Sequence, residues 1–262
     1  MIDPQVLDEL ARRASGFLER ARVPYSRRPE AAIILAADGT WIPGVRVESA
    51  SFSLAIPALL NAVSTAHAAG ITDLVVLVTA GRGASATLGA YVRGLPGTWE
   101  RITGAAWVNR EMDIPVLGAM LDPFLEPSST GPDIEDEIAL VRNLAARAFV
   151  PESDFRVGCL VRFKDGRALP GVNVEHPDWG NILCAERNAL STAVTWSCPE
   201  PERLVLTCLD DPTGTPCGAC RQLLAELAPT ARVIMDRGVA LAETRGVLDL
   251  LPGAFTGVGL GK

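Results

Sequence analysis

Three cysteines and one glutamate in the second half of the chain have the types and spacing of a catalytic metal centre. Cys184 and Glu186 stand in the stretch CAER, and Cys217 and Cys220 form a Cys-x-x-Cys pair further along. Three thiolates can hold a zinc ion tetrahedrally and leave its fourth position to water, which distinguishes catalytic zinc sites from structural ones. The spacing therefore predicts a zinc centre with Cys184, Cys217 and Cys220 as its ligands.

The residues that follow Cys184 fit hydrolysis. Glu186 comes two positions after that cysteine, where its carboxylate can take a proton from the water at the metal and pass it on, as hydrolytic deamination requires. Arg187 comes next, and its charge would offset the excess negative charge of three thiolates. We therefore expect Glu186 to be the catalytic residue and Arg187 to support the metal ligands.

A closed, structural zinc site is an alternative that the cysteines leave open. All of them lie in the second half, and the best candidate for a fourth ligand is Cys208, in the strand-like stretch VLTCLD. A Cys-x-x-Cys pair alone is also compatible with a redox pair. Its combination with the preceding Cys-Ala-Glu favours a catalytic zinc site over both alternatives.

Composition excludes several other classes of protein. The 262 residues carry a formal charge of -7 with scattered arginines, so we expect no nucleic acid polymer as a partner. Lys164 and Lys262 are the only lysines, and neither has the apolar setting of a Schiff-base residue. No apolar run is long enough to cross a membrane, and the acidic start MIDPQVLDEL is not a signal peptide, so a cytoplasmic location is the default expectation.

The chain contains an internal repeat at an offset of 127 residues. The stretch AIPALLNAVSTA at 55–66 corresponds to ILCAERNALSTA at 182–193. Three residues of the first copy stand where the second copy has its cysteine, glutamate and arginine: Pro57, Leu59 and Leu60. A repeat of about half the chain length indicates a duplicated domain. We therefore predict one half that is a scaffold and one half that carries the chemistry.

Both halves show the same order of predicted elements. Each starts with a helix, continues with an apolar strand, an Asp-Gly turn and a second strand, and then has the helix of the repeated motif, a third strand and a further helix. This order predicts an α/β protein, a tandem duplication of a three-layer α/β/α sandwich with a mixed sheet. The stretch EPSSTGPD places the boundary between a domain at 1–126 and a domain at 132–262.

The second half resembles the cytidine deaminase family of zinc hydrolases. The resemblance rests on the stretches FVPESDFRVGCL, GVNVE, CAERNAL, PCGACRQLL and LLPGAF. It implies deamination of cytidine and deoxycytidine to uridine and deoxyuridine with release of ammonia, as in pyrimidine salvage. The implied cofactor is Zn²⁺, held by three cysteines beside a glutamate that shuttles protons.

The resemblance also implies substrate contacts and an assembly. Asn173 and Glu175 would hold the sugar hydroxyls, and Phe155 would pack against the base. The backbone of Ala185 and Thr215 would hold the ring carbonyl and the amino group. The CAER form resembles small homotetrameric members, whereas the tandem arrangement resembles dimeric two-domain members. We therefore expect a homodimer in which the metal-free half takes the place of a second subunit.

The loop before Cys184 departs from the family pattern. It reads HPDWGNIL, and the family's tyrosine in the PYS position is Glu152 here. The four residues from His176 to Trp179, which include Pro177 and Asp178, either line a pocket for another amino-heterocycle or form a surface loop with an aromatic side chain at an interface. The first possibility would make the chain a deaminase of a cytosine-containing antibiotic or a related compound.

Overall fold

The computed structural model describes residues 2–81, 86–126 and 133–260. The first helix begins where its sequence predicts, because Asp3 accepts a hydrogen bond from the N–H of Gln5 and Pro4 occupies the first helical position. The elements of the first half are α1 (Pro4–Gly16), β1 (Glu30–Ala36), β2 (Trp41–Val45), α2 (Ala58–Ala68), β3 (Leu74–Gly81), α3 (Ala86–Arg93), β4 (Trp99–Thr103) and β5 (Ala106–Asn109).

The second half repeats most of this order. Its elements are α4 (Ile134–Ala145), β6 (Val157–Arg162), β7 (Ala168–Val172), α5 (Ala185–Thr195), β8 (Arg203–Cys208), α6 (Gly218–Leu227), β9 (Arg232–Arg237), β10 (Ala240–Gly246) and α7 (Val247–Leu250). Among the helices that the structure describes, none is both long and apolar enough to span a membrane.

Each half forms one five-stranded sheet, and three strands of each sheet pair in the same register. The strand orders are β2-β1-β3-β5-β4 and β10-β9-β8-β6-β7. Ile33 of β1 pairs with Val78 of β3, and Leu160 of β6 pairs with Val205 of β8, so each member of the second pair lies 127 residues after its counterpart. The repeat in the sequence is therefore a repeat in space, and the predicted tandem α/β duplication is confirmed.

The mixed sheet is confirmed for the second half and wrong for the first. In the second half, helix α6 crosses over between β8 and β9, which therefore run parallel. In the first half, strand β4 follows α3, and the chain then turns back through β5, which pairs antiparallel with both β4 and β3. The first sheet is therefore antiparallel throughout its described strands, and the two halves diverge after their third strand.

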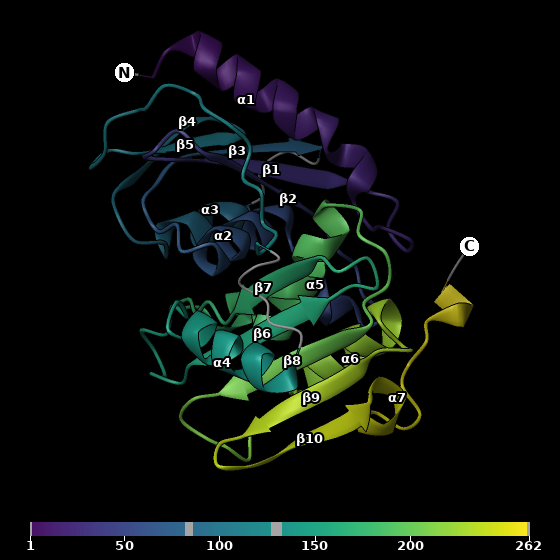
Figure 1. Ribbon diagram of the computed structural model, residues 1–262. Helices are drawn as coiled ribbons and strands as arrows, with labels where there is room; N and C mark the ends of the chain where they lie inside the picture. Colours follow the sequence, from purple (N-terminus) through teal and green to yellow (C-terminus); the bar gives the residue numbers. More distant parts are fainter. Residues whose placement is uncertain (1, 82–85, 127–132, 261–262) are drawn as a thin grey trace.

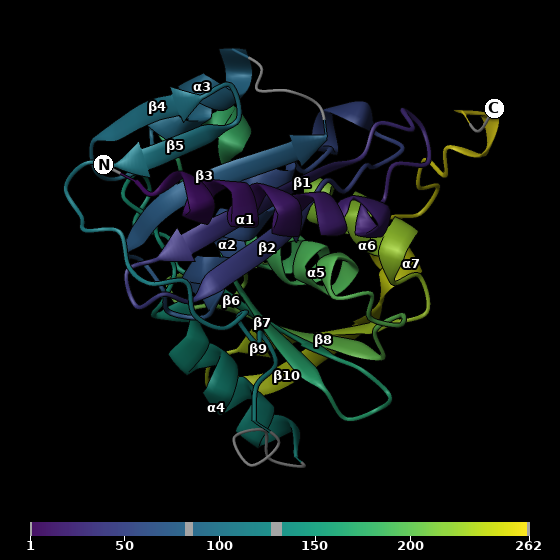
Figure 2. The ribbon, with the colours of Figure 1, turned by 90° about the horizontal axis from the view of Figure 1, so that it is seen from above.

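The layers of the two halves are stacked so that one helix of each lies in the middle. Helix α1 covers the outer face of the first sheet, and α4 covers the outer face of the second (Figure 1). Helices α2 and α5 lie side by side between the two sheets, as the view from above also shows (Figure 2). Each of these helices contacts both sheets, since α2 packs on β2 and β7 and α5 packs on β7 and β2.

Polar side chains join the two central helices. The hydroxyl groups of Thr65 and Thr192 lie 2.8 Å apart, and these residues are equivalent in the repeat. The Asn61 amide donates to the backbone oxygen of Ser191, and the Asn188 amide donates to the backbone oxygen of Ser64. The local twofold axis of the duplication therefore passes between the two threonines, and the repeated NA-x-STA motif is the contact between the halves.

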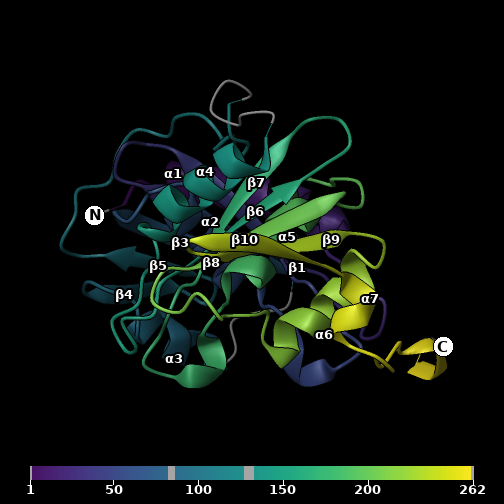
Figure 3. The same ribbon diagram turned by 60° about the horizontal axis from the view of Figure 1, so that its bottom comes forward.

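The boundary between the halves stays a prediction, because residues 127–132 lie outside the described part of the chain. The segment just before them already contacts the second half. The N–H of Leu125 donates to the oxygen of Ala168, and the guanidinium of Arg167 lies over the ring of Phe124. Residues 124–125 thus contact the second half, and Leu125 packs on the cluster that α4 forms with its sheet. Figure 3 shows α4 beside β6 and β7 of that sheet.

We predict that the threonine pair behaves as a unit. Thr65→Val or Thr192→Val alone leaves one buried hydroxyl with fewer partners, so each should lower the free energy of unfolding by about 1 kcal/mol. Replacing both removes both polar groups, so the double variant should cost less than the sum of the single ones. Urea unfolding of the four proteins measures this coupling, and strictly additive losses would contradict it.

Candidate active site

Two helix starts bring the predicted metal ligands together. Cys184 is the N-cap residue of α5, and Cys217 is the N-cap residue of α6, where its sulfur accepts a hydrogen bond from the N–H of Cys220 at 3.5 Å. Helix N-termini carry partial positive charge, which favours a thiolate. The close approach of β7 to α5 depends on Gly171, because a Cβ there would lie 2.2 Å from the oxygen of Ala185.

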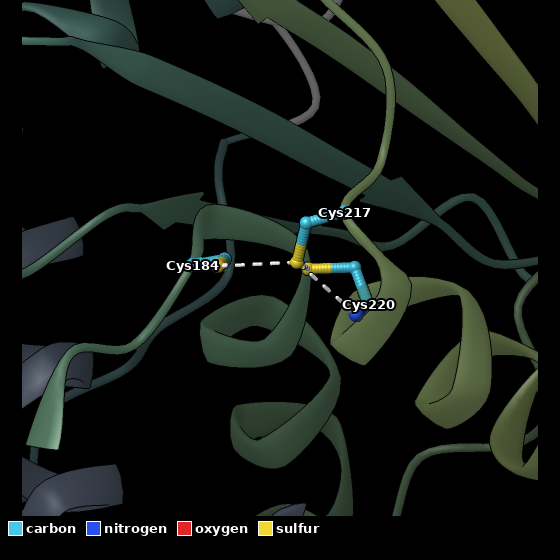
Figure 4. A group of neighbouring side chains, drawn as sticks. All are labelled: Cys184, Cys217 and Cys220. Atoms are coloured by element: carbon cyan, nitrogen blue, oxygen red, sulfur yellow. Dashed lines mark hydrogen bonds between the residues drawn. The ribbon is translucent and has the colours of Figure 1, made fainter. Parts of the chain in front are cut away.

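The three sulfur atoms have the spacing of a metal site. The sulfur of Cys217 lies 3.7 Å from that of Cys184 and 3.4 Å from that of Cys220, and all three lie within 4.8 Å of one another. Figure 4 shows the sulfur atoms pointing toward one another from the two helix starts. A tetrahedral zinc ion with three thiolate ligands needs sulfur atoms about 3.8 Å apart. The donor set therefore fits a zinc ion with small adjustments.

Hydrogen bonding makes the three thiols unequal. The Cys217 sulfur lies within hydrogen-bond distance of the sulfurs of Cys184 and Cys220, and these two contacts lower the pKa of Cys217. The contact with Cys217 raises the pKa of Cys184, and contacts first with Cys184 and then with Cys217 raise the pKa of Cys220. Binding of a metal ion by all three thiolates would therefore release protons from the cluster.

Glu186 lies in the first turn of α5, next to the cysteines. Its side chain is 3% exposed, and its Oε2 accepts a hydrogen bond from the Cys220 thiol at 3.3 Å. Burial raises the pKa of Glu186 to about 7, against the opposing effect of its own backbone N–H. A carboxyl group with a pKa near neutrality can both accept and donate a proton, as general acid-base catalysis requires.

Arg187 is held by the first half. Its Nη2 donates to the backbone oxygen of Leu54 at 3.0 Å, and its Nε is buried without a hydrogen-bond partner among the described residues. Its charge lowers the pKa of Glu186, in opposition to burial. In the part of the chain that the structure describes, no hydrogen bond joins Arg187 to a cysteine, so the predicted support of the ligands would act through its charge.

Asn173 and Glu175 hold the loop that carries Phe155. The Asn173 amide donates to the oxygen of Phe155 and accepts from the N–H of Val157, both at 2.8 Å. Glu175 accepts from the N–H groups of Glu152 and Ser153 at 2.9 and 3.0 Å. These two side chains, predicted to hold the sugar, thus also shape the loop beside them.

The first half contains a copy of the glutamate contact. Glu48, the counterpart of Glu175, accepts from the N–H groups of Tyr25 and Ser26 at 3.2 and 3.0 Å. Because that half has no cysteine and no acid at the position of Glu186, the loop contact is part of the fold and does not depend on the chemistry. The sequence pattern VE marked a binding residue and did not reveal this second role.

The other predicted substrate contacts differ in their exposure to solvent. Ala185 is buried, and Phe155 is 36% exposed. Thr215 is exposed, and its hydroxyl accepts from Arg221 at 2.9 Å, which leaves its backbone as the predicted contact group. Among the described residues, no hydrogen bond joins Asn173 or Glu175 to the cysteine cluster.

The HPDWGN loop is divided between an interface and the surface. His176 is buried, stacks on Tyr91 of α3 with ring centroids 4.9 Å apart, and contacts the first half. Trp179 is 73% exposed. The structure thus supports the interface interpretation for His176.

Cys208, the candidate for a fourth zinc ligand, stands outside the cysteine cluster.

Comparison with known proteins identifies the family. The family model described as "Cytidine and deoxycytidylate deaminase zinc-binding region" matches residues 133–236. A cytidine deaminase of Halalkalibacterium halodurans is 38% identical over 115 residues, which are 42% of this chain and 83% of that protein. The chain belongs to the cytidine deaminase family. It is accordingly a hydrolase that acts on a C–N bond, and its cofactor is zinc, since the cysteine cluster lies inside the matched zinc-binding region.

Two further similar proteins complete the comparison. A cytidine deaminase of Mycobacterium tuberculosis is 38% identical over 113 residues, covering 42% of this chain and 80% of that protein. Among solved structures, cytidine deaminase from Burkholderia pseudomallei is 31% identical and covers 47% of this chain and 99% of its own, with a TM-score of 0.44. The family match covers the second half, so the first half must be understood from its contacts with the family's zinc-binding region.

Two of these contacts were not predicted from the sequence. The backbone oxygen of Leu54 binds Arg187, and the backbone oxygen of Tyr91 binds His176. A main-chain acceptor can belong to any residue type, so no motif marks either position. The only signal in the sequence was the unusual histidine in the family's loop.

We predict one zinc ion per chain, bound at the cysteine cluster. Cys217→Ser should lose most of the zinc, because a central thiolate of a three-ligand site is removed. Cys208→Ser is the matched control and should keep a full complement, since Cys208 lies outside the cluster. Metal analysis of the purified proteins measures both. Loss of zinc from Cys208→Ser would instead indicate a closed site.

Proposed function

We propose that the chain hydrolyses the exocyclic amine of cytidine and deoxycytidine, giving uridine or deoxyuridine and ammonia. The observation that carries this proposal is the contact between the cysteine cluster and a buried acid: the Cys220 sulfur lies 3.3 Å from Glu186 Oε2. The match to the zinc-binding region of the family and the relatives named cytidine deaminase support the same reaction.

Each residue of the centre has a role in this proposal. Cys184, Cys217 and Cys220 hold the zinc ion, which when bound supplies the activation of a water molecule. Glu186 takes a proton from the attacking water, delivers it to the ring nitrogen and assists departure of the amine as ammonia. The guanidinium of Arg187 offsets part of the negative charge of the thiolates.

The nucleoside would lie against the loop that Asn173 and Glu175 shape. These side chains would hold the sugar hydroxyls, and Phe155, whose ring is partly exposed, would cover the base. The backbone of Ala185 and Thr215 would hold the ring carbonyl and the amino group. The loop contacts of Asn173 and Glu175 support this arrangement, because they fix both side chains in place before a sugar arrives.

The alternatives lose their main support. His176 is buried against α3, so it is not free to select an unusual heterocycle. Cys208 stands outside the cysteine cluster, and an acid lies directly beside that cluster, which is not what a purely structural zinc site needs.

The decisive experiment is turnover by the zinc-loaded protein. We expect loss of the cytosine ultraviolet band and release of ammonia with cytidine and with deoxycytidine. Glu186→Gln should lower kcat by about 10²- to 10⁴-fold, because it removes the proton carrier and keeps the side-chain shape. Its zinc content should match that of the parent. If the zinc-loaded parent turns over neither nucleoside, the proposed substrate is wrong.

We further propose that the chain forms a homodimer. Trp179 is 73% exposed, and Phe52, its equivalent in the repeat, is 90% exposed, so both halves present a large aromatic side chain at the same place. Aromatic side chains of this kind dominate protein interfaces.

Light scattering should give twice the mass of 27.7 kDa. Trp179→Ser should weaken the dimer by about tenfold or more, because the proposed interface would lose an aromatic side chain that the dimer buries. Val239→Ser, which changes an exposed apolar residue at the β9–β10 turn, is the control and should leave the dimer unchanged. A parent protein that is monomeric at all concentrations would contradict the proposal.

A further inference from the structure

The loop between the predicted sugar contact Glu175 and the ligand Cys184 is attached to the metal-free half through one side chain. His176 is 4% exposed, and its Nε2 lies 2.9 Å from the backbone oxygen of Tyr91. The rings of His176 and Tyr91 stack with an interplanar angle of 19°. The acceptor lies in the last turn of α3, and it also accepts from the backbone N–H of Gly94 at 3.0 Å.

The hydrogen bonds of His176 select one form of its ring. Nδ1 accepts from the N–H of Asp178 at 2.9 Å, so this nitrogen carries no proton. Nε2 must then carry the proton of a neutral imidazole, and it donates that proton to the oxygen of Tyr91. One ring thus links the metal-free half on one side to the loop backbone on the other.

The first half is shaped to receive this ring. Gly94, which follows α3, touches it so closely that a Cβ at this position would lie 2.2 Å from Nε2 of His176. Gly89, within α3, is different, because a Cβ there would meet only the flexible guanidinium of Arg93 at 3.6 Å. A side chain at position 94 would therefore collide with the His176 ring, whereas the backbone conformation at the end of α3 does not itself require glycine.

The loop transmits this attachment toward the zinc centre. Asp178, fixed by His176, accepts from the N–H of Gly180 at 3.0 Å and so holds the turn over Trp179–Asn181. Leu183 then pairs with Val174, and the next residue is Cys184. In the direction of the N-terminus, the neighbour of His176 is Glu175.

The opposite half has an equivalent attachment of different chemistry. Ser49, the counterpart of His176, donates to Glu226 of α6 at 2.6 Å. Each half thus holds the other's loop through the helix that follows its third strand, but only the loop of the second half leads to metal ligands. The attachment belongs to the shared frame, and in one copy it serves the active centre.

We propose that His176 is a positioning residue through which the metal-free half sets the loop that receives the nucleoside. This inference rests on the proposed function for its kinetic consequence and on the contacts of His176 for its structural basis. The attachment acts on the substrate side of the centre, because Cys184 and Glu186 are separately fixed by the buried helix α5. Its loss should therefore raise KM more than it lowers kcat.

Two pairs of variants test the attachment. Gly94→Ala adds one methyl group in the metal-free half and should displace the ring, whereas Gly89→Ala, within the preceding helix α3, is the matched control. His176→Gln keeps a donor near the position of Nε2, and His176→Asn keeps only an acceptor near that of Nδ1. We expect Gly94→Ala and His176→Asn to raise KM for cytidine about three- to tenfold. Both variants should keep a full complement of zinc and a nearly unchanged kcat. Gly89→Ala and His176→Gln should stay within about twofold of the parent.

Combining the two damaging changes gives a sharper test. Gly94→Ala with His176→Asn should be no worse than either change alone, because both break the same link. Three results would each overturn the proposal. The first is a KM like that of the parent for Gly94→Ala and His176→Asn, and the second is additive increases of KM in the double variant. The third is a KM like that of the parent for His176→Asn together with a raised KM for His176→Gln.

Hydrogen exchange provides a readout that needs no turnover. The amide of Asp178 is bonded to His176, so the peptide spanning residues 176–183 should exchange faster in Gly94→Ala and at the parent rate in Gly89→Ala. If the parent protein converts neither cytidine nor deoxycytidine, the proposed function fails and this exchange comparison decides the positioning role alone. Equal exchange in the two glycine variants would overturn it.

Discussion

The pairing of α2 with α5 is the constraint on which the rest of the structure depends. Both helices are buried along almost their whole length, and both carry asparagine, serine and threonine side chains toward each other. Buried polar groups need partners, and hydrogen bonds of Asn61, Asn188 and the threonine pair cross from one helix to the other. Either half alone would lose the hydrogen bonds that cross between the two helices. Because Cys184 and Glu186 begin α5, the zinc centre rests on a helix whose opposite face is completed by the metal-free half.

This constraint explains which parts of the repeat were kept. The NA-x-STA positions make the contact between the helices, so both copies retain them. The counterparts of Cys184, Glu186 and Arg187 in the first copy do not make this contact, and they are apolar residues. Glu48 and Glu175 follow the same rule, since both close the same loop and only one lies in the half with metal ligands.

The sequence was sufficient where local chemistry decides and insufficient where the two halves meet. Cys184, Cys217 and Cys220 could be predicted to converge because helix starts and ligand spacing are local features, and the repeat predicted the duplicated strands. The antiparallel course of β5 could not be predicted, because the degraded segment after α3 carries no trace of a lost crossover. The hydrogen bond between His176 and Tyr91 could not be predicted for another reason, because its acceptor is a main-chain oxygen 85 residues away in the sequence.

The fusion of the two halves has a consequence for how such a protein can change. In an assembly of identical subunits, a substitution at a twofold interface is inherited on both sides at once, so it must be tolerated twice. In this chain the two sides are encoded separately. Equivalent places have already diverged, with Ser49 on Glu226 in one attachment and His176 on Tyr91 in the other. One codon can therefore alter the support of the active loop while its symmetry mate stays as it is, and duplication has turned a repeated contact into two independently heritable ones.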